Sequence, residues 1–290
     1  MGKATKIILI TAAILITAGI IITVIGYNFV SRNKPVSAAT FEKKEQTITD
    51  GFDSISVDEI SADIKLVPST DGTTKIEYYD SEQLEHKICV KSGTLEVSVH
   101  DNALIHGWWE YVVNFDWTFS SFDDTTKTTV IYLPEASYKS LTAHGVSSDI
   151  EVDKAFTFEK VKFTTTSGDI KSYCVITDSF TANTTSGDVS VSNIDLELAD
   201  VSTVSGEVIF NDSKISRKID IDTTSGDVTL NNVTSENTSV NTVSGDVKGT
   251  LVGDHQYETD TVSGDISLPS NIKGAASVDI DTVSGDIKFA

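Results

Sequence analysis

The sequence predicts an all-β protein, a parallel β-solenoid of about 19–21-residue coils, preceded by one N-terminal transmembrane helix. Three observations lead to this prediction. A Ser-Gly-Asp motif recurs at nearly constant spacing. The residues around it alternate between apolar and polar. Residues 7–30 form an uncharged, mostly aliphatic run.

The repeat occupies residues 141–290, where successive copies are 19 to 21 residues apart. A variant copy is centred on Ser148. The copies with a central glycine fall at Gly168, Gly187, Gly206, Gly226, Gly245, Gly264 and Gly285. Repeats with a period of this length are typical of solenoids, propellers and arrays. The glycine supplies a bend, because it tolerates positive φ angles.

The residues around each glycine indicate strands. Near Gly226, apolar or small side chains stand at alternate positions, as in Ile221, Thr223, Val228 and Leu230. Period-two alternation is typical of a half-buried β-strand. About 20 residues hold two or three short strands and their turns, so each repeat is predicted to be one coil. The alternative, a meander of hairpins, is less economical because antiparallel pairing would not stack identical positions in one register.

Stacking of the coils predicts columns of threonine and serine beside a column of acids. The acidic column contains Asp169, Asp188, Glu207, Asp227, Asp246, Asp265 and Asp286. In one interpretation each carboxylate accepts backbone N–H groups of its own turn. In the other, the column is a cation stripe that collects Ca²⁺. The first is favoured because calcium β-roll repeats are shorter and richer in glycine, and no other cofactor is expected.

Residues 1–34 are predicted to be a membrane anchor. The apolar run at residues 7–30 is 24 residues long, and about 20 apolar residues span a bilayer. The alternative is a cleaved signal peptide, but its apolar region is usually only about 7–15 residues. Basic residues flank both sides of the run, so a positive-inside count alone would place the repeats in the cytoplasm. The acidic body fits the outer face better, and we expect the solenoid there.

The remaining segments are predicted as a tether at residues 35–50 and an N-terminal β cap region at residues 51–140. The cap region carries an aromatic insertion, residues 104–122, with all three tryptophans. Two interpretations remain for it: a hairpin whose rings are buried on the solenoid, or an exposed patch for a lipid, glycan or protein. In the second, the candidate binding residues are Trp108, Trp109, Tyr111 and Trp117.

Catalysis finds little support in the sequence, so we expect a protein that is not an enzyme. The histidines lack metal-ligand spacing, and a nucleophilic serine would not recur in every coil. A net charge of −21 argues against a nucleic-acid partner, because phosphates require basic residues. Cys89 and Cys174 are expected to be isolated core residues. The last coil, residues 286–290, is predicted to expose unpaired backbone that could bind a partner strand or self-associate.

The chain also resembles a known group. It is similar to the bacterial "putative adhesin" family of β-strand-repeat surface proteins, a domain of unknown function common in Firmicutes, over roughly residues 40–290. The residues that carry the resemblance are Phe52-x-x-Ile55-x-Val57, Ser61-Ala62-Asp63-Ile64, Gly93-Thr94-Leu95, Ile131-Tyr132-Leu133-Pro134 and the repeated Thr-x-Ser-Gly-Asp-Val/Ile. The resemblance implies a solenoid outside the cell, and some relatives belong to the envelope-stress response. It implies no catalytic residues.

Together these observations predict a membrane-anchored cell-envelope protein of a Gram-positive bacterium, a single-pass protein of the cell membrane with a solenoid interaction surface. It would be adhesin-like or part of the envelope-stress response. One alternative is a regulator that senses an envelope component through residues 104–122. A more remote alternative is a β-helix enzyme acting on polysaccharides, which would need a carboxylate or histidine cluster outside the repeat columns.

Overall fold

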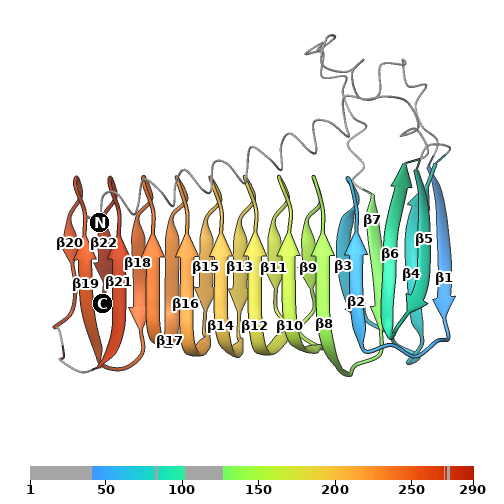
Figure 1. Cartoon of the computed structure of the whole chain (residues 1–290), viewed down its shortest axis with the longest axis horizontal. Coiled ribbons are helices and arrows are strands. Elements are labelled where there is room, and N and C mark those ends of the chain that lie inside the picture. The colour runs from blue at the N-terminus through green and yellow to red at the C-terminus, as the bar shows by residue number, and fades with distance from the viewer. Residues whose placement is uncertain (1–40, 82–83, 102–126, 271, 273–274) are drawn as a thin grey trace, which may run out of the picture.

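The computed structural model describes residues 41–81, 84–101, 127–270, 272 and 275–290. In these ranges the chain forms 22 β-strands joined by turns, and no helix occurs among them. The strands lie side by side along a rod that ends at β19 (His255–Asp260) and β20 (Ile266–Ser267) (Figure 1). The all-β prediction is confirmed.

The predicted transmembrane helix at residues 7–30 and the aromatic segment at residues 104–122 lie outside the described residues. Within the ranges that are described, no helix has the length and apolarity to cross a membrane.

Two sheets run the length of the rod, and each coil contributes one strand to each. In spatial order, sheet A contains β1 (Glu42–Ile48), β4 (Thr74–Asp80), β7 (Thr128–Leu133), β3 (Asp63–Pro68), β9 (Ile150–Val152), β11 (Ile170–Ser172), β13 (Val189–Ser192), β15 (Val208–Asn211), the first half of β17 (Val228–Asn241), β18 (Val247–Leu251), β22 (Ile287–Phe289) and β20.

Sheet B lies opposite sheet A and extends along the same rod. It contains β5 (Leu84–Lys91), β6 (Thr94–Asp101), β2 (Ser54–Asp58), β8 (Ser137–His144), β10 (Thr157–Thr164), β12 (Val175–Asn183), β14 (Asp195–Ser202), β16 (Lys214–Asp222), the second half of β17, β21 (Ala276–Asp281) and β19. All neighbours are parallel except for β1, β4 and β5, which pair antiparallel. The parallel solenoid is therefore confirmed.

Equivalent positions of successive coils stand side by side, as the repeat requires. Val208 of β15 pairs with Val189 on one side and Val228 on the other. In the same strand, Val208 and Phe210 are buried, whereas Ile209 and Asn211 are only half-buried. Alternate side chains of a strand point to opposite faces, so the period-two pattern places one apolar column inside the rod.

That interior column fills the core next to sheet A. Its members from β3 to β22 are at most 1% exposed: Ile64, Ile150, Ile170, Val189, Val208, Val228, Val247 and Ile287. Full burial of each such side chain contributes about 1.5–3 kcal/mol of transfer free energy. Repeated over the coils, this term stabilises a rod that has no globular centre.

The coils do not stack in sequence order at the C-terminal end. The last coil, β21–β22, lies between the coil of β17 and β18 and the coil of β19 and β20. β22 therefore has a strand neighbour on both sides. The prediction that residues 286–290 form an open edge is wrong, because the earlier β19–β20 coil covers them.

The same exchange occurs at the N-terminal end. The coil β2–β3 lies between β6–β7 and β8–β9, although it precedes both of them in the sequence. Strands β4 and β1 extend sheet A beyond β7, and β5 extends sheet B beyond β6. Residues 51–140 thus contribute two coils to the stack as well as antiparallel strands that cover its end.

Candidate functional site

The repeated threonine holds the bend before each glycine. In five successive coils its hydroxyl oxygen accepts the N–H of the glycine three residues later, at 3.0–3.2 Å. The pairs are Thr165–Gly168, Thr184–Gly187, Thr203–Gly206, Thr223–Gly226 and Thr242–Gly245. The threonines are buried, so this bond satisfies a backbone donor that water cannot reach.

The repeated glycine is required by close approach between coils. A Cβ atom at Gly206 would lie 1.8 Å from the carbonyl oxygen of Gly187, and one at Gly187 would lie 1.8 Å from that of Gly168. Such contacts lie far inside van der Waals distance, and the obstacle is backbone that a side-chain rotation cannot move. The glycine column is thus a packing requirement.

The acidic column joins most coils to the next. Its carboxylate accepts the N–H of the acid in the following coil, as from Asp169 to Asp149 at 2.8 Å and from Asp188 to Asp169 at 3.0 Å. This corrects the expectation that each carboxylate serves its own turn. The ladder follows the spatial order, because the Asp286 N–H donates to Asp246 and the Asp265 N–H donates to Asp286. Among the described residues, no group of three or more metal-ligating side chains could hold a cation.

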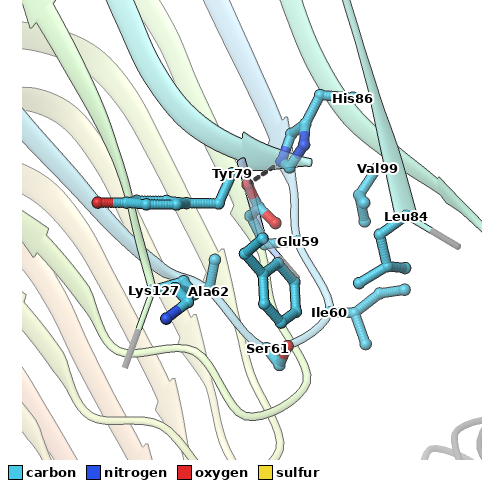
Figure 2. Close-up of a pocket in the computed structure, with 10 residues that line it drawn as sticks. Glu59, Ile60, Ser61, Ala62, Tyr79, Leu84, His86, Val99 and Lys127 are labelled. Atoms are coloured by element: carbon cyan, nitrogen blue, oxygen red, sulfur yellow. Dashed lines mark hydrogen bonds and ion pairs between the residues drawn. The ribbon is translucent and has the colours of Figure 1, made fainter. Parts of the chain in front are cut away.

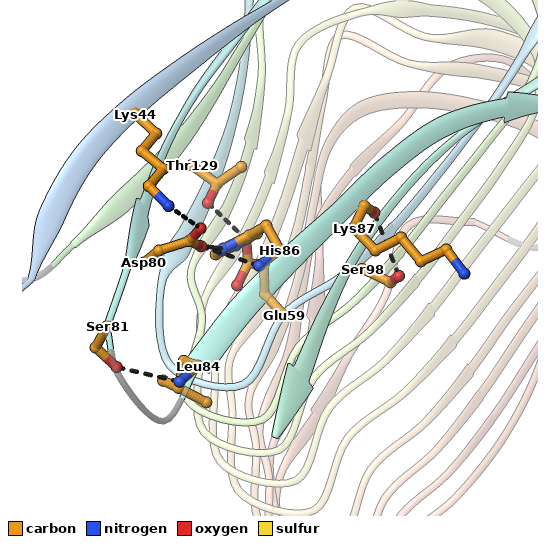
Figure 3. Close-up of polar contacts among 9 residues, drawn as sticks. All are labelled: Lys44, Glu59, Asp80, Ser81, Leu84, His86, Lys87, Ser98 and Thr129. Carbon is orange, nitrogen blue, oxygen red and sulfur yellow. Dashed lines mark hydrogen bonds and ion pairs between the residues drawn. The ribbon is translucent and has the colours of Figure 1, made fainter. Parts of the chain in front are cut away.

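A different cluster lies where the antiparallel strands meet the solenoid. Its centre is the ring of His86 in β5, between two carboxylates (Figure 3). Nε2 is 2.9 Å from Glu59 Oε1, and Nδ1 is 2.8 Å from Asp80 Oδ1. The side chains of His86, Glu59 and Asp80 are 3%, 2% and 9% exposed. We call these three residues the ionic cluster.

Neighbouring groups complete the ionic cluster. The Thr129 hydroxyl donates to Glu59 Oε1 at 2.5 Å, and the backbone N–H of His86 donates to Asp80 Oδ1 at 2.9 Å. Lys44 Nζ is 3.0 Å from Asp80 Oδ2. The cluster therefore connects β1, β4, β5 and β7 to the turn after β2.

The surroundings of the His86 ring favour its charged form. Both ring nitrogens face carboxylate oxygens, and both can donate only in the imidazolium. Burial alone would lower the pKa of His86, but the hydrogen bonds and charges of Glu59 and Asp80 outweigh it, so the pKa is raised. Burial would likewise raise the pKa of Asp80, yet the bonds from His86 and Lys44 lower it. An imidazolium bonded on both sides has no free lone pair with which to act as a base.

A shallow cavity opens beside the ionic cluster (Figure 2). His86, Glu59, Tyr79 and Lys127 are among the residues that line it. Val99 near the end of β6 and Lys127 just before β7 also line the cavity. These two residues precede and follow the aromatic segment, residues 104–122, in the sequence.

The remaining candidate residues fall in three groups. Trp108, Trp109, Tyr111 and Trp117 lie outside the described residues. Cys174 is buried and free, and burial raises its pKa to about 11, which keeps it an inert thiol. Cys89 is a free, half-buried cysteine in β5. The two cysteines form no disulfide.

Sequence comparison places these features in a family. The model of the Toastrack DUF4097 family matches residues 52–290, which include both exchanged coils and the ionic cluster. The chain belongs to this family. Within solved structures, a "putative lipid binding protein" from Parabacteroides distasonis aligns with 87% of this Toastrack chain and 97% of its own, at 16% identity and a TM-score of 0.52. The likeness shows a shared fold.

A "putative adhesin" from Bacteroides fragilis aligns with 88% of the Toastrack chain and 99% of its own, at 14% identity and a TM-score of 0.42. A search of curated proteins gave no match. The family resemblance drawn from the sequence is confirmed.

Sequence reasoning missed the ionic cluster of this Toastrack protein. Its three residues lie outside the Ser-Gly-Asp motif, and Glu59 is 27 positions from His86. One signal was available. His86 shares a strand face with Ile88 and Val90, and a polar residue on an apolar face needs a buried partner.

Proposed function

We propose that this protein is a non-enzymatic, membrane-anchored cell-envelope protein, adhesin-like, whose solenoid is an interaction surface. The observation that carries the proposal is how the repeat uses its side chains. The threonine, glycine and acid of the motif are engaged in stacking the coils, which leaves them no role in chemistry. Both ring nitrogens of His86 are likewise engaged, with the carboxylates of Asp80 and Glu59.

A binding experiment tests this proposal. Full-length protein in detergent is incubated with envelope fractions of its source cell, separated into wall and membrane, and recovered by co-sedimentation. The expected result is saturable recovery with one fraction. A matched assay for new reducing ends on wall polysaccharide should stay at the background rate. Sugar release that requires folded protein would instead support the enzyme alternative.

The location is tested in the same cells. We expect the solenoid outside a single-pass anchor at residues 7–30, so protease added to intact cells should remove it. If the solenoid survives until the membrane is permeabilised, the orientation is reversed. A role in envelope stress predicts that the protein becomes more abundant after exposure to a cell-wall-active antibiotic.

A second candidate function is the sensing of an envelope ligand through residues 104–122. It is favoured by the cavity lined by Val99 and Lys127, which precede and follow this segment in the sequence. The test compares wild type with a variant carrying Trp108→Ala, Trp109→Ala and Trp117→Ala. If the folded variant loses the envelope binding described above, the aromatic segment is the recognition site. Unchanged binding assigns recognition to the solenoid.

A further inference from the structure

The end coil of β19 and β20 exposes apolar side chains to an unusual degree. Eight large hydrophobic residues of the described chain are exposed, and four of them lie between residues 252 and 272. Val262 is 80% exposed and Ile266 is 45% exposed. Val262 occupies the corner before Gly264, and Ile266 begins β20.

Ile266 belongs to the interior column of the rod. It pairs with Ile287, which pairs with Val247, and both of these are fully buried. Ile266 has the same orientation, but among the described strands β20 has a neighbour only in β22. Within the described part of the chain, the exposed surface of Ile266 is therefore the open end of the core.

The backbone and carboxylate groups at this end follow the same pattern that joins the coils within the rod. In the stack, the residue that follows each acid donates its backbone N–H to the backbone carbonyl of the acid in the next coil. Ile287 donates in this way to Asp265 at 2.9 Å. By the same pattern, the N–H of Ile266 points away from the rod. The carboxylate of Asp265 is likewise placed to accept the N–H of a further strand, as Asp286 accepts that of Asp265.

The carbonyl of Gly264 adds a steric requirement. From Gly168 onward, each motif glycine lies so close to the carbonyl of the preceding coil in the stack that a Cβ there would stand about 2 Å from the oxygen, as at Gly285 over Gly245 and Gly264 over Gly285. A strand that continues the stack over Gly264 must therefore have glycine at that position.

We propose that residues 262–268 bind an extended segment of another polypeptide in parallel register, by strand addition to β20. The partner segment carries a glycine that sits on Gly264. A non-proline residue follows it, whose N–H the Asp265 carboxylate accepts. Next comes an aliphatic residue that covers Ile266. This is the chemistry of one more Ser-Gly-Asp-Val coil, and the site continues the interface between the inner coils. The inference rests on the proposed function and names its partner class.

The test uses a peptide as the probe. Residues 223–231, TTSGDVTLN, are labelled with a fluorophore and titrated with full-length protein in detergent, and anisotropy is read. The matched peptide differs only by Gly226→Ala. The protein variants are Ile266→Lys, at the proposed site, and Leu198→Lys, a residue 37% exposed in β14, away from the end coil.

We expect saturable binding of the glycine peptide to wild type and to Leu198→Lys with the same Kd. The alanine peptide and the Ile266→Lys variant should each weaken binding by about tenfold or more, which corresponds to about 1.4 kcal/mol. Equal binding of the two peptides, unchanged binding by Ile266→Lys, or no saturable binding to wild type would each overturn the proposal. If Ile266→Lys fails to fold by circular dichroism, Val262→Lys replaces it.

The co-sedimentation experiment keeps the two proposals apart. If wild type binds an envelope fraction but not the peptide, the interaction surface lies elsewhere on the solenoid and only the strand-addition site is lost. If wild type binds the peptide but no envelope fraction, the site stands and the proposed envelope function fails.

Discussion

The two ends of the rod differ although the coils between them are alike. At the N-terminal end, β4 and β5 cover the coil β6–β7, and its Leu95 and Leu133 are fully buried. At the C-terminal end, Ile266 of the interior column is 45% exposed. The comparison teaches that the repeat lengthens the core but cannot close it. Closure requires strands of a different pattern, and here the ionic cluster holds those strands in place.

The strongest test of this comparison contrasts the middle of the stack with its open end. Gly206→Ala should destabilise the protein by more than about 4 kcal/mol, because its Cβ would meet the Gly187 carbonyl between two fixed coils. Gly264→Ala makes a similar clash with Gly285, but the end coil can move away. Gly264→Ala should therefore lower the unfolding free energy by less than Gly206→Ala. Urea unfolding followed by circular dichroism measures both. Equal losses would mean that the end coil is as firmly held as the middle.

The closed end should depend on His86. His86→Ala leaves two buried carboxylates without their shared cation, which should cost about 3–5 kcal/mol. His144→Ala is the matched control, since His144 also bonds an aspartate, Asp58 at 3.0 Å, but its side chain is 48% exposed. The control should change the unfolding free energy by less than about 0.5 kcal/mol. Similar effects of both substitutions would contradict a special role for the ionic cluster.

The closed end should also weaken with rising pH. The pKa of His86 in the folded protein is raised above its ordinary value of 6.5, so its contribution is complete below pH 6.5 and is lost as the pH rises through the folded pKa. The pKa of Asp80 is lowered from 3.8, so its contribution is present above that value and is lost as the pH falls through the folded pKa.

The unfolding free energy, measured from pH 3 to pH 9, should therefore fall at both extremes. The loss on the alkaline side should be smaller than that of His86→Ala, since the neutral ring still donates one hydrogen bond. His86→Gln should flatten the alkaline limb. An alkaline limb of unchanged slope in that variant would assign the pH dependence to other groups.

The smallest effect is expected at the open end. Val262→Lys should leave the unfolding free energy within about 0.5 kcal/mol of wild type, because the Val262 side chain is 80% exposed and covers little of the core. The measurement is again urea unfolding. A loss comparable to that of a buried valine would mean that another part of the chain covers this corner.

The regular part of the fold could be predicted from the sequence because it depends on local pattern. Alternation around Gly226 predicts strands, and the spacing of the glycines predicts coils that stack in register. The order of the last coils could not be predicted. β21–β22 and β19–β20 carry the same Thr-Val-Ser-Gly-Asp-Ile sequence, so their local pattern fits either position.

The ionic cluster escaped prediction for a different reason. Asp80 and His86 are close in sequence, but Glu59 and Thr129 join them only through the pairing of β2, β3 and β7. No spacing rule connects residues that are brought together by long-range strand pairing. The acidic column was anticipated as a column, whereas the direction of its hydrogen bonds emerged only from the stacked coils.

The exchanged coils also set an order of events during synthesis. The ribosome delivers β19 and β20 before β21 and β22, yet the folded rod seats the later pair beneath the earlier one. The β19–β20 coil therefore cannot reach its final neighbours until the last strand has been made. At the other end, β2 and β3 must likewise wait for β6 to β9 before both of their edges are paired. Elongation of the chain and growth of the rod thus proceed in different orders, and the outermost layer at each end is settled late.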